Sequence, residues 1–303
     1  MTEFQKIVKG FAVAFAIFLT ISIVGGIFSA ISFGIGGLNW IGNQNESNAG
    51  ENEEQLNFYD ADKVKSIKLE QVACNIEIVE GEEFSVFSQN ITSYKEKLSS
   101  NGVLKIENDS LPFFSFGKQI NGKTAKIVIT VPKETDIKKI TIGGGAGNMK
   151  LENIAADKLE IDAGAGNINL NEVKSSELDI DGGAGNIEGK TITADKVEID
   201  AGVGNVEFYE VNFADIDLDC GMGNVKISGT VEGDNKIDCG VGEVEILLED
   251  EIEEYDFSVD SGVGNISIDG KKYGEVNHTN SAANHSFDID GGVGNCTIKE
   301  INE

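Results

Sequence analysis

The chain has 303 residues, of which 52 are acidic and 24 are Lys or Arg, and its formal net charge at pH 7 is −28. All 24 of those basic residues are lysines, and their small number argues against the basic patches that bind nucleic acid or anionic lipid. With 40% hydrophobic residues the chain is too apolar for a disordered polyelectrolyte. We therefore expect a folded, acidic protein that binds no nucleic acid.

The N-terminal region is predicted to cross a membrane. Residues 10–33 are uncharged and almost entirely apolar, and about 20 such residues suffice for a helix to span the hydrocarbon core. Lys6 and Lys9 precede this segment, so the excess of positive charge on the inner side places residues 1–9 in the cytoplasm. A cleaved secretory signal ending near Ala30 is the alternative, but the apolar core of such signals spans only about 7–15 residues.

The next two regions differ in composition. Residues 34–57 are read as a polar stalk, since most of them are polar and show no hydrophobic periodicity. From 58 to 140, short segments such as 64–69 and 125–131 alternate apolar with polar residues, and Gly- and Asn-containing turns separate them. We predict an irregular β cap, or the first rungs of a larger β structure, over 58–140.

The most regular feature is a Gly-x-Gly unit that recurs eight times. Its first glycines are Gly145, Gly164, Gly183, Gly202, Gly221, Gly240, Gly262 and Gly292, so the spacings are 19, 19, 19, 19, 19, 22 and 30 residues. A fixed period of this size is typical of a solenoid with one short rung per repeat, whereas a propeller blade needs about 40 residues. We therefore predict a regular β-solenoid over 141–303, with an insertion at 269–286.

Equivalent positions in the repeats indicate a turn at the glycines. The residues three places before and four places after the first glycine are mostly aliphatic. These two positions are an odd number of residues apart, so both can face inward only if a turn or bulge between them changes the parity of the inward-facing residues. Glycine accepts the positive φ of a tight corner and the close approach of another backbone. The predicted structural turn residues are Gly145, Gly147, Gly164, Gly166, Gly183, Gly185, Gly202, Gly204, Gly221 and Gly223. The fold class is therefore all-β, a single-stack β-solenoid of 19-residue rungs behind an N-terminal transmembrane helix.

Several segments resemble a known bacterial family. Ser66-Ile-Lys-Leu-Glu, Asn75-Ile-Glu-Ile, Lys126-Ile-Val-Ile-Thr-Val-Pro-Lys and the repeated Gly-x-Gly-Asn-Ile are similar to the LiaG-like "putative adhesin" family over roughly residues 58–300. The resemblance implies an extracytoplasmic β-solenoid that is often membrane-anchored and sometimes linked to cell-envelope stress. It supplies no catalytic residues.

An acidic column is the candidate site. Aspartates stand two places before the first glycine and alternate with inward isoleucines, so they face outward; they are Asp162, Asp181, Asp200, Asp219, Asp238, Asp260 and Asp290. Charges on neighbouring rungs, about 4.8 Å apart, repel by about 3.5 kcal/mol at an effective dielectric of 20. In the structural interpretation, corner amides and the lysine column at Lys139, Lys158 and Lys196 relieve this repulsion. In the functional one, the aspartates from Asp162 to Asp238 form a Ca²⁺ ladder.

Two other columns have structural interpretations. An asparagine follows the second glycine in seven repeats, at Asn148, Asn167, Asn186, Asn205, Asn224, Asn265 and Asn295, and we expect a ladder of side-chain amides with left-handed backbone. Cys220 and Cys239 are expected to face inward on neighbouring rungs, within disulfide range. Free thiols are favoured over a disulfide there, because the column requires only small residues.

No pattern typical of catalysis is found. The two histidines, His278 and His285, both fall in the insertion, and no nucleophile or phosphate-binding motif is present. We expect a non-catalytic binding or scaffolding protein of the bacterial cell envelope, single-pass in the cell membrane with its C-terminal domain extracytoplasmic. Its partner would be an envelope protein or a surface ligand, and no cofactor is expected except possible Ca²⁺. A divalent-cation-binding solenoid is the alternative, and a polysaccharide lyase is least favoured.

Overall fold

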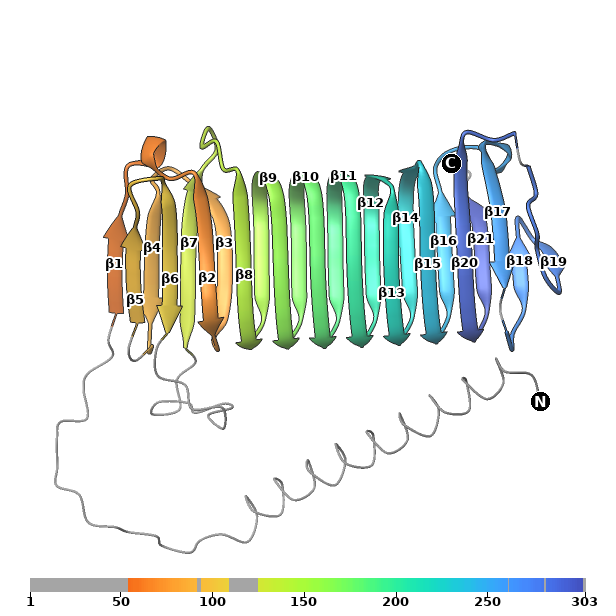
Figure 1. The fold of residues 1–303 in the computed structure, drawn as a ribbon, viewed down its shortest axis with the longest axis horizontal. Helices are drawn as coiled ribbons and strands as arrows, with labels where there is room; N and C mark the ends of the chain where they lie inside the picture. Colours follow the sequence, from red (N-terminus) through yellow and green to blue (C-terminus); the bar gives the residue numbers. More distant parts are fainter. Residues whose placement is uncertain (1–53, 92–93, 109–124, 261, 281, 302–303) are drawn as a thin grey trace, which may run out of the picture. The chain divides into compact units, whose positions relative to one another are not determined.

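The computed structural model describes residues 54–91, 94–108, 125–260, 262–280 and 282–301, and within them the fold is all-β (Figure 1). Two short 3-10 helices, η1 (Ala61–Lys63) and η2 (Ile252–Glu254), interrupt the strands. The predicted transmembrane helix at 10–33 and nearly all of the predicted stalk at 34–57 lie outside the described residues. In the part of the chain that is described, no helix has the length and apolarity needed to span a membrane.

The centre of the molecule is a stack of parallel rungs, as the 19-residue period predicts. Its strands are β8 (Lys139–Ala146), β9 (Met149–Ala165), β10 (Ile168–Ala184), β11 (Ile187–Val203), β12 (Val206–Ala214), β13 (Ile216–Met222), β14 (Val225–Glu232) and β15 (Asp234–Val241). Ile168 lies beside Met149 on one side and Ile187 on the other. The sequence period is therefore the register shift from one rung to the next.

Each regular rung has three sides. Along β10 the buried positions are 168 and 170, then 173 and 175, then 178 and 180, so the inward parity changes twice within the strand. It changes a third time across the Gly-Asn pair that follows β10, because the next buried residue is Ile187. Three changes of parity mean three corners. We call the sides face A, face B and face C, after residues 177–184, 168–171 and 173–175 of β10.

The corner between faces B and C was not predicted. It is formed by a residue with left-handed backbone in each rung: Asn153, Glu172, Thr191 and Glu210 have φ between 52° and 55°. A non-glycine residue adopts this conformation at some cost, and Asn does so most readily. Only the first of the four has that preference, which explains why this column carries no recognisable sequence signal.

The interior is filled by continuous ladders of aliphatic side chains. On face A, Ile142, Ile161, Ile180, Ile199 and Leu218 occupy one row, and each is at most 1% exposed. Full burial of such a side chain contributes about 1.5–3 kcal/mol. At the C-terminal end aromatic rings replace the aliphatics, with the rings of Phe257 and Phe287 stacked at 5.9 Å.

At the N-terminal end the rungs do not follow chain order. The strands there are β1 (Glu54–Phe58), β2 (Ser66–Val72), β3 (Asn75–Gly81), β4 (Ser85–Gln89), β5 (Tyr94–Leu98), β6 (Val103–Asn108) and β7 (Lys126–Pro132). The rung made of β2 and β3 pairs with β8 and β9 on one side and with β6 and β7 on the other. The first rung in sequence is therefore second in space, and β5 and β4 cover β6 and β7 by antiparallel pairing.

The C-terminal end repeats this arrangement. Its strands are β16 (Val244–Leu248), β17 (Tyr255–Asp260), β18 (Ile266–Ile268), β19 (Lys271–Tyr273), β20 (His285–Val293) and β21 (Cys296–Glu300). The last rung, β20 and β21, lies between the rung of β15 and β16 and the rung of β17 and β18. Lys299 and Glu300 end β21, so the inserted rung extends almost to the end of the described chain.

Insertion of the first rung at the N-terminal end and of the last rung at the C-terminal end protects the edges of the sheet. A terminal strand of a solenoid exposes unpaired backbone groups that recruit other chains. Here the first and last rungs are paired along both edges, and the outermost rungs are covered by the short antiparallel strands β4, β5 and β19 (Figure 1). The outermost rung at each end is joined to the rest of the stack through the inserted rung. Fraying of either end therefore begins at that outermost rung.

Candidate functional site

The predicted acidic column is one continuous row on face A. Asp162, Asp181, Asp200, Asp219 and Asp238 are register partners in β9, β10, β11, β13 and β15. The row then passes through Asp290 to Asp260, because β20 lies between β15 and β17. Each of these side chains is exposed or half-buried, as predicted from its alternation with the inward isoleucines.

Corner amides do not relieve the charge of the column as expected. Among the described residues, such a bond forms at the end of the stack, where the Gly262 N–H donates to Asp260 Oδ1 at 2.9 Å. In β10 the equivalent segment is extended and Gly182 pairs in register with Ala163, so its amides serve the ladder between rungs. Because the strand continues through the first glycine, the turn comes later, at the second glycine and the asparagine.

The lysine column contacts carboxylates of its own row and of the row next to it: Glu177 stands in the lysine column between Lys158 and Lys196, and Glu160 lies in the adjacent row. Lys139 Nζ is 2.5 Å from a carboxylate oxygen of Glu160, and Lys158 Nζ is 2.7 Å from one of Glu177. These acids are not members of the aspartate column. Lys236 is the lysine that contacts the column, at 2.5 Å from Asp238 Oδ2.

Repulsion persists near the C-terminal end of the column. The pKa of Asp219 is raised, first by desolvation, then by the hydrogen bond and the repulsion from Asp238, with a smaller contribution from Asp200. The pKa of Asp290 is raised by desolvation and then by the charges of Asp238 and Asp260. Over the described ranges, no three His, Cys, Asp or Glu side chains converge in a way that could hold a metal ion. The column is thus a line of carboxylates rather than a cage.

The Gly-Asn corner between faces A and B is built from two kinds of close contact. At the second glycines from Gly147 to Gly223 φ lies between 141° and 155°, a conformation that L side chains rarely adopt. A Cβ placed on Gly185 would lie 2.0 Å from the carbonyl oxygen of Gly166 on the next rung. From Asn148 to Asn224 the side-chain oxygen of each asparagine accepts a hydrogen bond from a backbone N–H of the adjacent rung; Asn186 N–H to Asn167 Oδ1 is 3.0 Å.

The asparagine ladder therefore differs from the one predicted. It runs from side chain to backbone, starts at Asn75 on the first rung and reaches Glu243, whose own N–H donates to Asn224 Oδ1 at 3.0 Å. The predicted amide-to-amide contact occurs between Asn265 and Asn295, at 3.2 Å. None of the asparagines of this column has the left-handed backbone that was expected. The glycine before each one supplies the corner, so asparagine is needed only as an acceptor.

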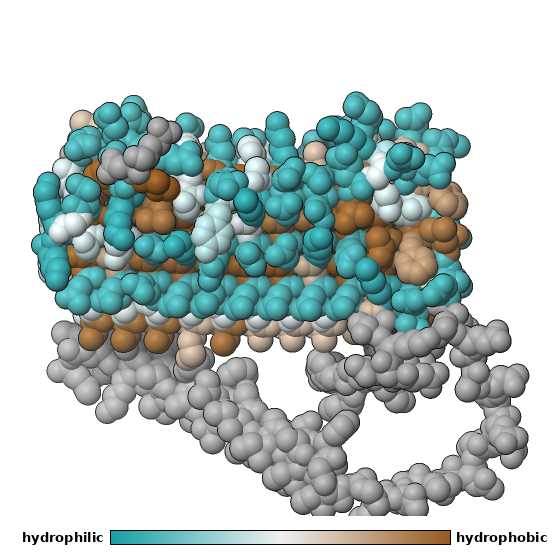
Figure 2. Space-filling model, turned by 180° about the vertical axis from the view of Figure 1, so that it is seen from behind, coloured by the Kyte–Doolittle hydropathy of each residue, from teal (hydrophilic) through white to brown (hydrophobic). Residues whose placement is uncertain are grey.

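The same corner carries an apolar surface that the sequence analysis missed. The middle residue of each Gly-x-Gly unit points away from the core, and in spatial order these residues are Ala146, Ala165, Ala184, Val203, Met222, Val241, Val293 and Val263. We call this row the corner ridge. Figure 2 shows it as a line of brown and tan spheres along the lower edge of the stack, beneath a hydrophilic row. Val241 is 46% exposed and Val263 is 69% exposed.

The cysteines are buried free thiols, as predicted. Cys220 and Cys239 are register partners on neighbouring rungs, and each is 3% exposed. The pKa of the Cys239 thiol is raised by a hydrogen bond with Cys220 and by burial. Burial likewise raises the pKa of Cys74 and of Cys296 to about 12. A thiol that stays protonated at neutral pH is a weak nucleophile, so Cys74, Cys239 and Cys296 act as small apolar side chains. Cys220 differs, because the hydrogen bond with Cys239 lowers its pKa.

The two histidines have local partners rather than each other. His278 Nδ1 lies 2.8 Å from Asp256 Oδ2, and Nδ1 of His285 accepts the N–H of Gly233 at 2.9 Å. His285 is the first residue of β20, where this bond joins the inserted rung to the turn before β15. The first contact ties the insertion to β17, and the second ties β20 to the turn before β15.

Comparisons with known proteins give one family and several solved structures. The model of the family described as Toastrack DUF4097 matches residues 64–299. A "putative adhesin" structure from Bacteroides fragilis is similar at 17% identity over 83% of this chain and 97% of that chain, with a TM-score of 0.49. A "putative adhesin" from Parabacteroides merdae is similar at 12% identity over 84% of this chain and 97% of that one, with a TM-score of 0.41. The comparison with curated proteins found no match.

The raised pKa of Asp219 generates a prediction for Asp219→Asn. The Asp219 carboxyl group binds its proton more tightly in the folded state than in the unfolded state. Its contribution to the stability of the folded state therefore grows as the pH falls through the folded-state pKa toward the unfolded value of about 3.9. The variant removes the repulsion, which is worth about 1 kcal/mol at most, so its Tm at pH 7 should exceed that of the wild type by about 2–4 °C. This advantage should shrink toward pH 4 in scanning calorimetry.

Asp136→Asn is the matched control, because the pKa of Asp136 is lowered by its hydrogen bond and ion pair with Lys138. This variant should be no more stable than the wild type at pH 7. An advantage of Asp219→Asn that stays constant between pH 7 and pH 4 would contradict the electrostatic account.

Proposed function

The chain belongs to the Toastrack DUF4097 family, and we propose that it is a non-catalytic binding or scaffolding protein of the bacterial cell envelope. Within the family we assign it to the LiaG-like group, whose motifs it resembles at Ser66–Glu70 and Asn75–Ile78. In this proposal residues 10–33 anchor it in the cell membrane and the stack is extracytoplasmic. The partner is a second membrane protein of the envelope.

The observation that supports this proposal most directly is the corner ridge. Its side chains point outward at an exposed corner, so the interior places no demand on their chemistry. Nevertheless all eight are apolar, and they vary among Ala, Val and Met, so the row is more than a repeated copy of one residue. Contiguous exposed apolar rows are unusual on monomeric proteins and mark sites of protein contact. The ridge is therefore the surface on which we expect the partner to bind.

The geometry of the ridge suggests what the partner looks like. Seven rung spacings of about 4.8 Å make the ridge about 34 Å long, and the in-phase register keeps its side chains at fixed spacing. On the face A side it runs parallel to the aspartate column, whereas on the other side it borders the uncharged asparagines. A complementary partner presents an apolar strip with lysine or arginine along one edge only, because unlike charges steer and orient association.

The path of the chain favours a membrane-bound partner. Glu54 is the first residue of β1, and its register partner in β4 is Gln89. Gln89 in turn pairs with Lys126 of β7, and Lys126 pairs with Asn75 at the corresponding corner of the first rung. The chain therefore enters the described stack at the corner that bears the ridge. A tether of about 20 residues after the proposed anchor spans at most about 70 Å. It would keep the ridge within reach of other proteins of the same membrane.

Site-specific photo-crosslinking tests this proposal. We replace Val203 or Val241 with p-benzoylphenylalanine in the full-length protein and irradiate the cells that make it. Because both positions lie on the ridge, they should give the same discrete adduct with one membrane protein. Thr230 on face C, which is outward-facing and half-buried, provides the control position and should give no such adduct. Equal adducts from Thr230, or none from either ridge position, would refute the proposal.

The raised pKa values of Asp219 and Asp290 favour one alternative, a divalent-cation-binding solenoid that uses the ladder from Asp162 to Asp238. Carboxylate oxygens suit Ca²⁺, and a bound cation would offset the repulsion within the column. The absence of a three-carboxylate cluster among the described residues makes it the weaker candidate.

Thermal unfolding in calcium tests the alternative. A ligand at 100 times its Kd stabilises the folded state by about 2.7 kcal/mol, which corresponds to an increase in Tm of about 5–10 °C. If the ladder binds Ca²⁺, millimolar CaCl2 should raise the Tm of the full-length protein above its value in NaCl of equal ionic strength, and Asp219→Asn should reduce the effect. Equal Tm values in the two salts would eliminate the calcium ladder.

A further inference from the structure

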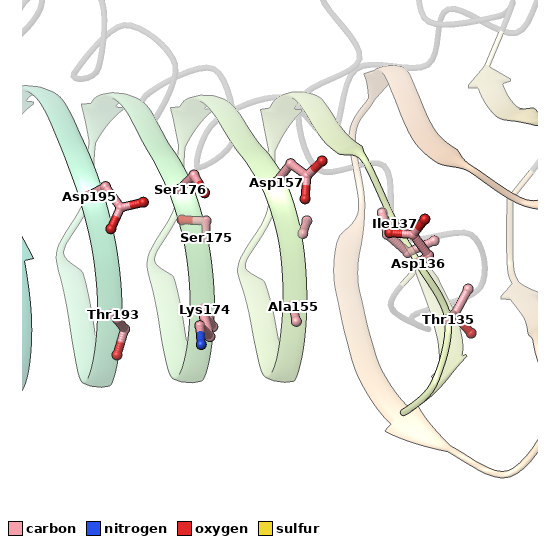
Figure 3. A pocket seen from close by; sticks show the side chains of 11 residues that line it. Thr135, Asp136, Ile137, Ala155, Asp157, Lys174, Ser175, Ser176, Thr193 and Asp195 are labelled. Carbon is pink, nitrogen blue, oxygen red and sulfur yellow. The ribbon is translucent and has the colours of Figure 1, made fainter.

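A polar groove on face C has no role in the fold or in the ridge. It crosses four successive rungs near the corner between faces C and A, and its volume is about 230 Å³ (Figure 3). Outward residues Lys174 and Thr193 and corner residues Asp157 and Asp195 line it. Because it extends over three rung spacings, it is about 14 Å long and runs along the axis of the stack.

The groove exists because the inward column of face C is small at this point. Ala156, Ser175 and Ala194 are register partners on three rungs, whereas the next rung has Phe213 in the same row. Small side chains beneath three rungs leave the surface hollow, and the phenylalanine fills the interior where the hollow ends. The groove is thus a property of a few specific side chains rather than of the repeat.

Two buried hydroxyl groups at the groove lack partners. Thr135 Oγ1 and Ser175 Oγ are, within the described residues, the buried side-chain polar atoms without a hydrogen-bond partner, and both residues line this groove. Ser175 is 6% exposed. An unsatisfied buried polar group costs about 1–3 kcal/mol. Alanine occupies the same row on both neighbouring rungs, so packing does not require a hydroxyl at Ser175.

The charges at the groove are balanced in part. Lys138 Nζ lies 2.8 Å from Asp136 Oδ1 and 3.3 Å from Asp157 Oδ2, and its one positive charge offsets one of the two carboxylate charges at that end. Lys174 and Asp195 add an ammonium donor and a carboxylate acceptor farther along. The site thus offers donors and acceptors together, while its carboxylates and the net charge of −28 disfavour an acidic ligand.

We propose that the face C groove binds an uncharged, hydroxyl-rich oligosaccharide whose chain runs along the stack axis. Hydroxyl groups both donate and accept, so they match the mixed polar lining. In this proposal the ligand supplies the hydrogen-bond partner that the hydroxyls of Ser175 and Thr135 lack, Lys174 donates to it and Asp195 accepts from it. This site lies on a different face from the ridge, so the proposal goes beyond the protein partner and does not depend on it.

Calorimetric titration of the full-length protein tests this proposal, with hexa-N-acetylchitohexaose and cellohexaose as uncharged probes and hexagalacturonate as the acidic one. Thr193→Trp places an indole in the groove and should weaken binding of the uncharged probes by about tenfold or more. Thr230→Trp is the matched control, because Thr230 lies in the same outward row two rungs beyond Thr193, and it should bind as the wild type does.

Ser175→Ala distinguishes a binding role from a structural one. Removing an unpartnered hydroxyl between two alanines should leave the Tm unchanged or higher, yet it should weaken binding of the uncharged probes by about threefold or more. The proposal is overturned if neither uncharged probe binds, if Thr193→Trp binds as the wild type does, or if hexagalacturonate binds as tightly as the uncharged probes.

Discussion

The close approach of successive backbones at the Gly-Asn corner is the constraint on which the rest of the structure depends. A Cβ on the second glycine would enter the space of the neighbouring carbonyl, as at Gly185, so the rungs can pack at sheet spacing only where that atom is missing. Each rung alone buries too little apolar surface to offset the entropy of ordering its backbone. Stacking supplies the missing stabilisation, and the corner permits the stacking.

The exposed surfaces follow from this constraint. Because every rung repeats the same register, any outward position becomes a row. Rows of like charge repel, and at Asp219 this repulsion adds to desolvation in raising the pKa. The corner itself leaves its middle residue in solvent, and there the chain places apolar residues that the core does not need. The face C groove is the exception to the repetition, since it depends on Ser175 and its two alanine neighbours. Features that the repeat does not require are the ones to which we assign binding.

The repeat could be predicted from the sequence because its signal is local. Glycine spacing gave the period, and the alternation of Ile161 with Asp162 gave the inward and outward sides. The exchange of rung order at both ends could not be predicted. The repeat pattern allows either β17 or β20 to lie beside β15, and only the packing of the complete stack selects β20. The corner at Glu172 was missed because its backbone conformation has no fixed residue type. The ridge was missed because alanine and valine in a repeat suggest burial.

The most direct test of the central claim is the free energy of unfolding of Gly185→Ala, measured with denaturant. The added Cβ would lie 2.0 Å from the carbonyl oxygen of Gly166 at a residue whose φ is +147°, so we expect a loss of about 3–5 kcal/mol or failure to fold. Gly274→Ala, whose Cβ would meet nothing within 4 Å, should stay within about 0.5 kcal/mol of the wild type. A Gly185→Ala protein as stable as the Gly274→Ala protein would contradict the account.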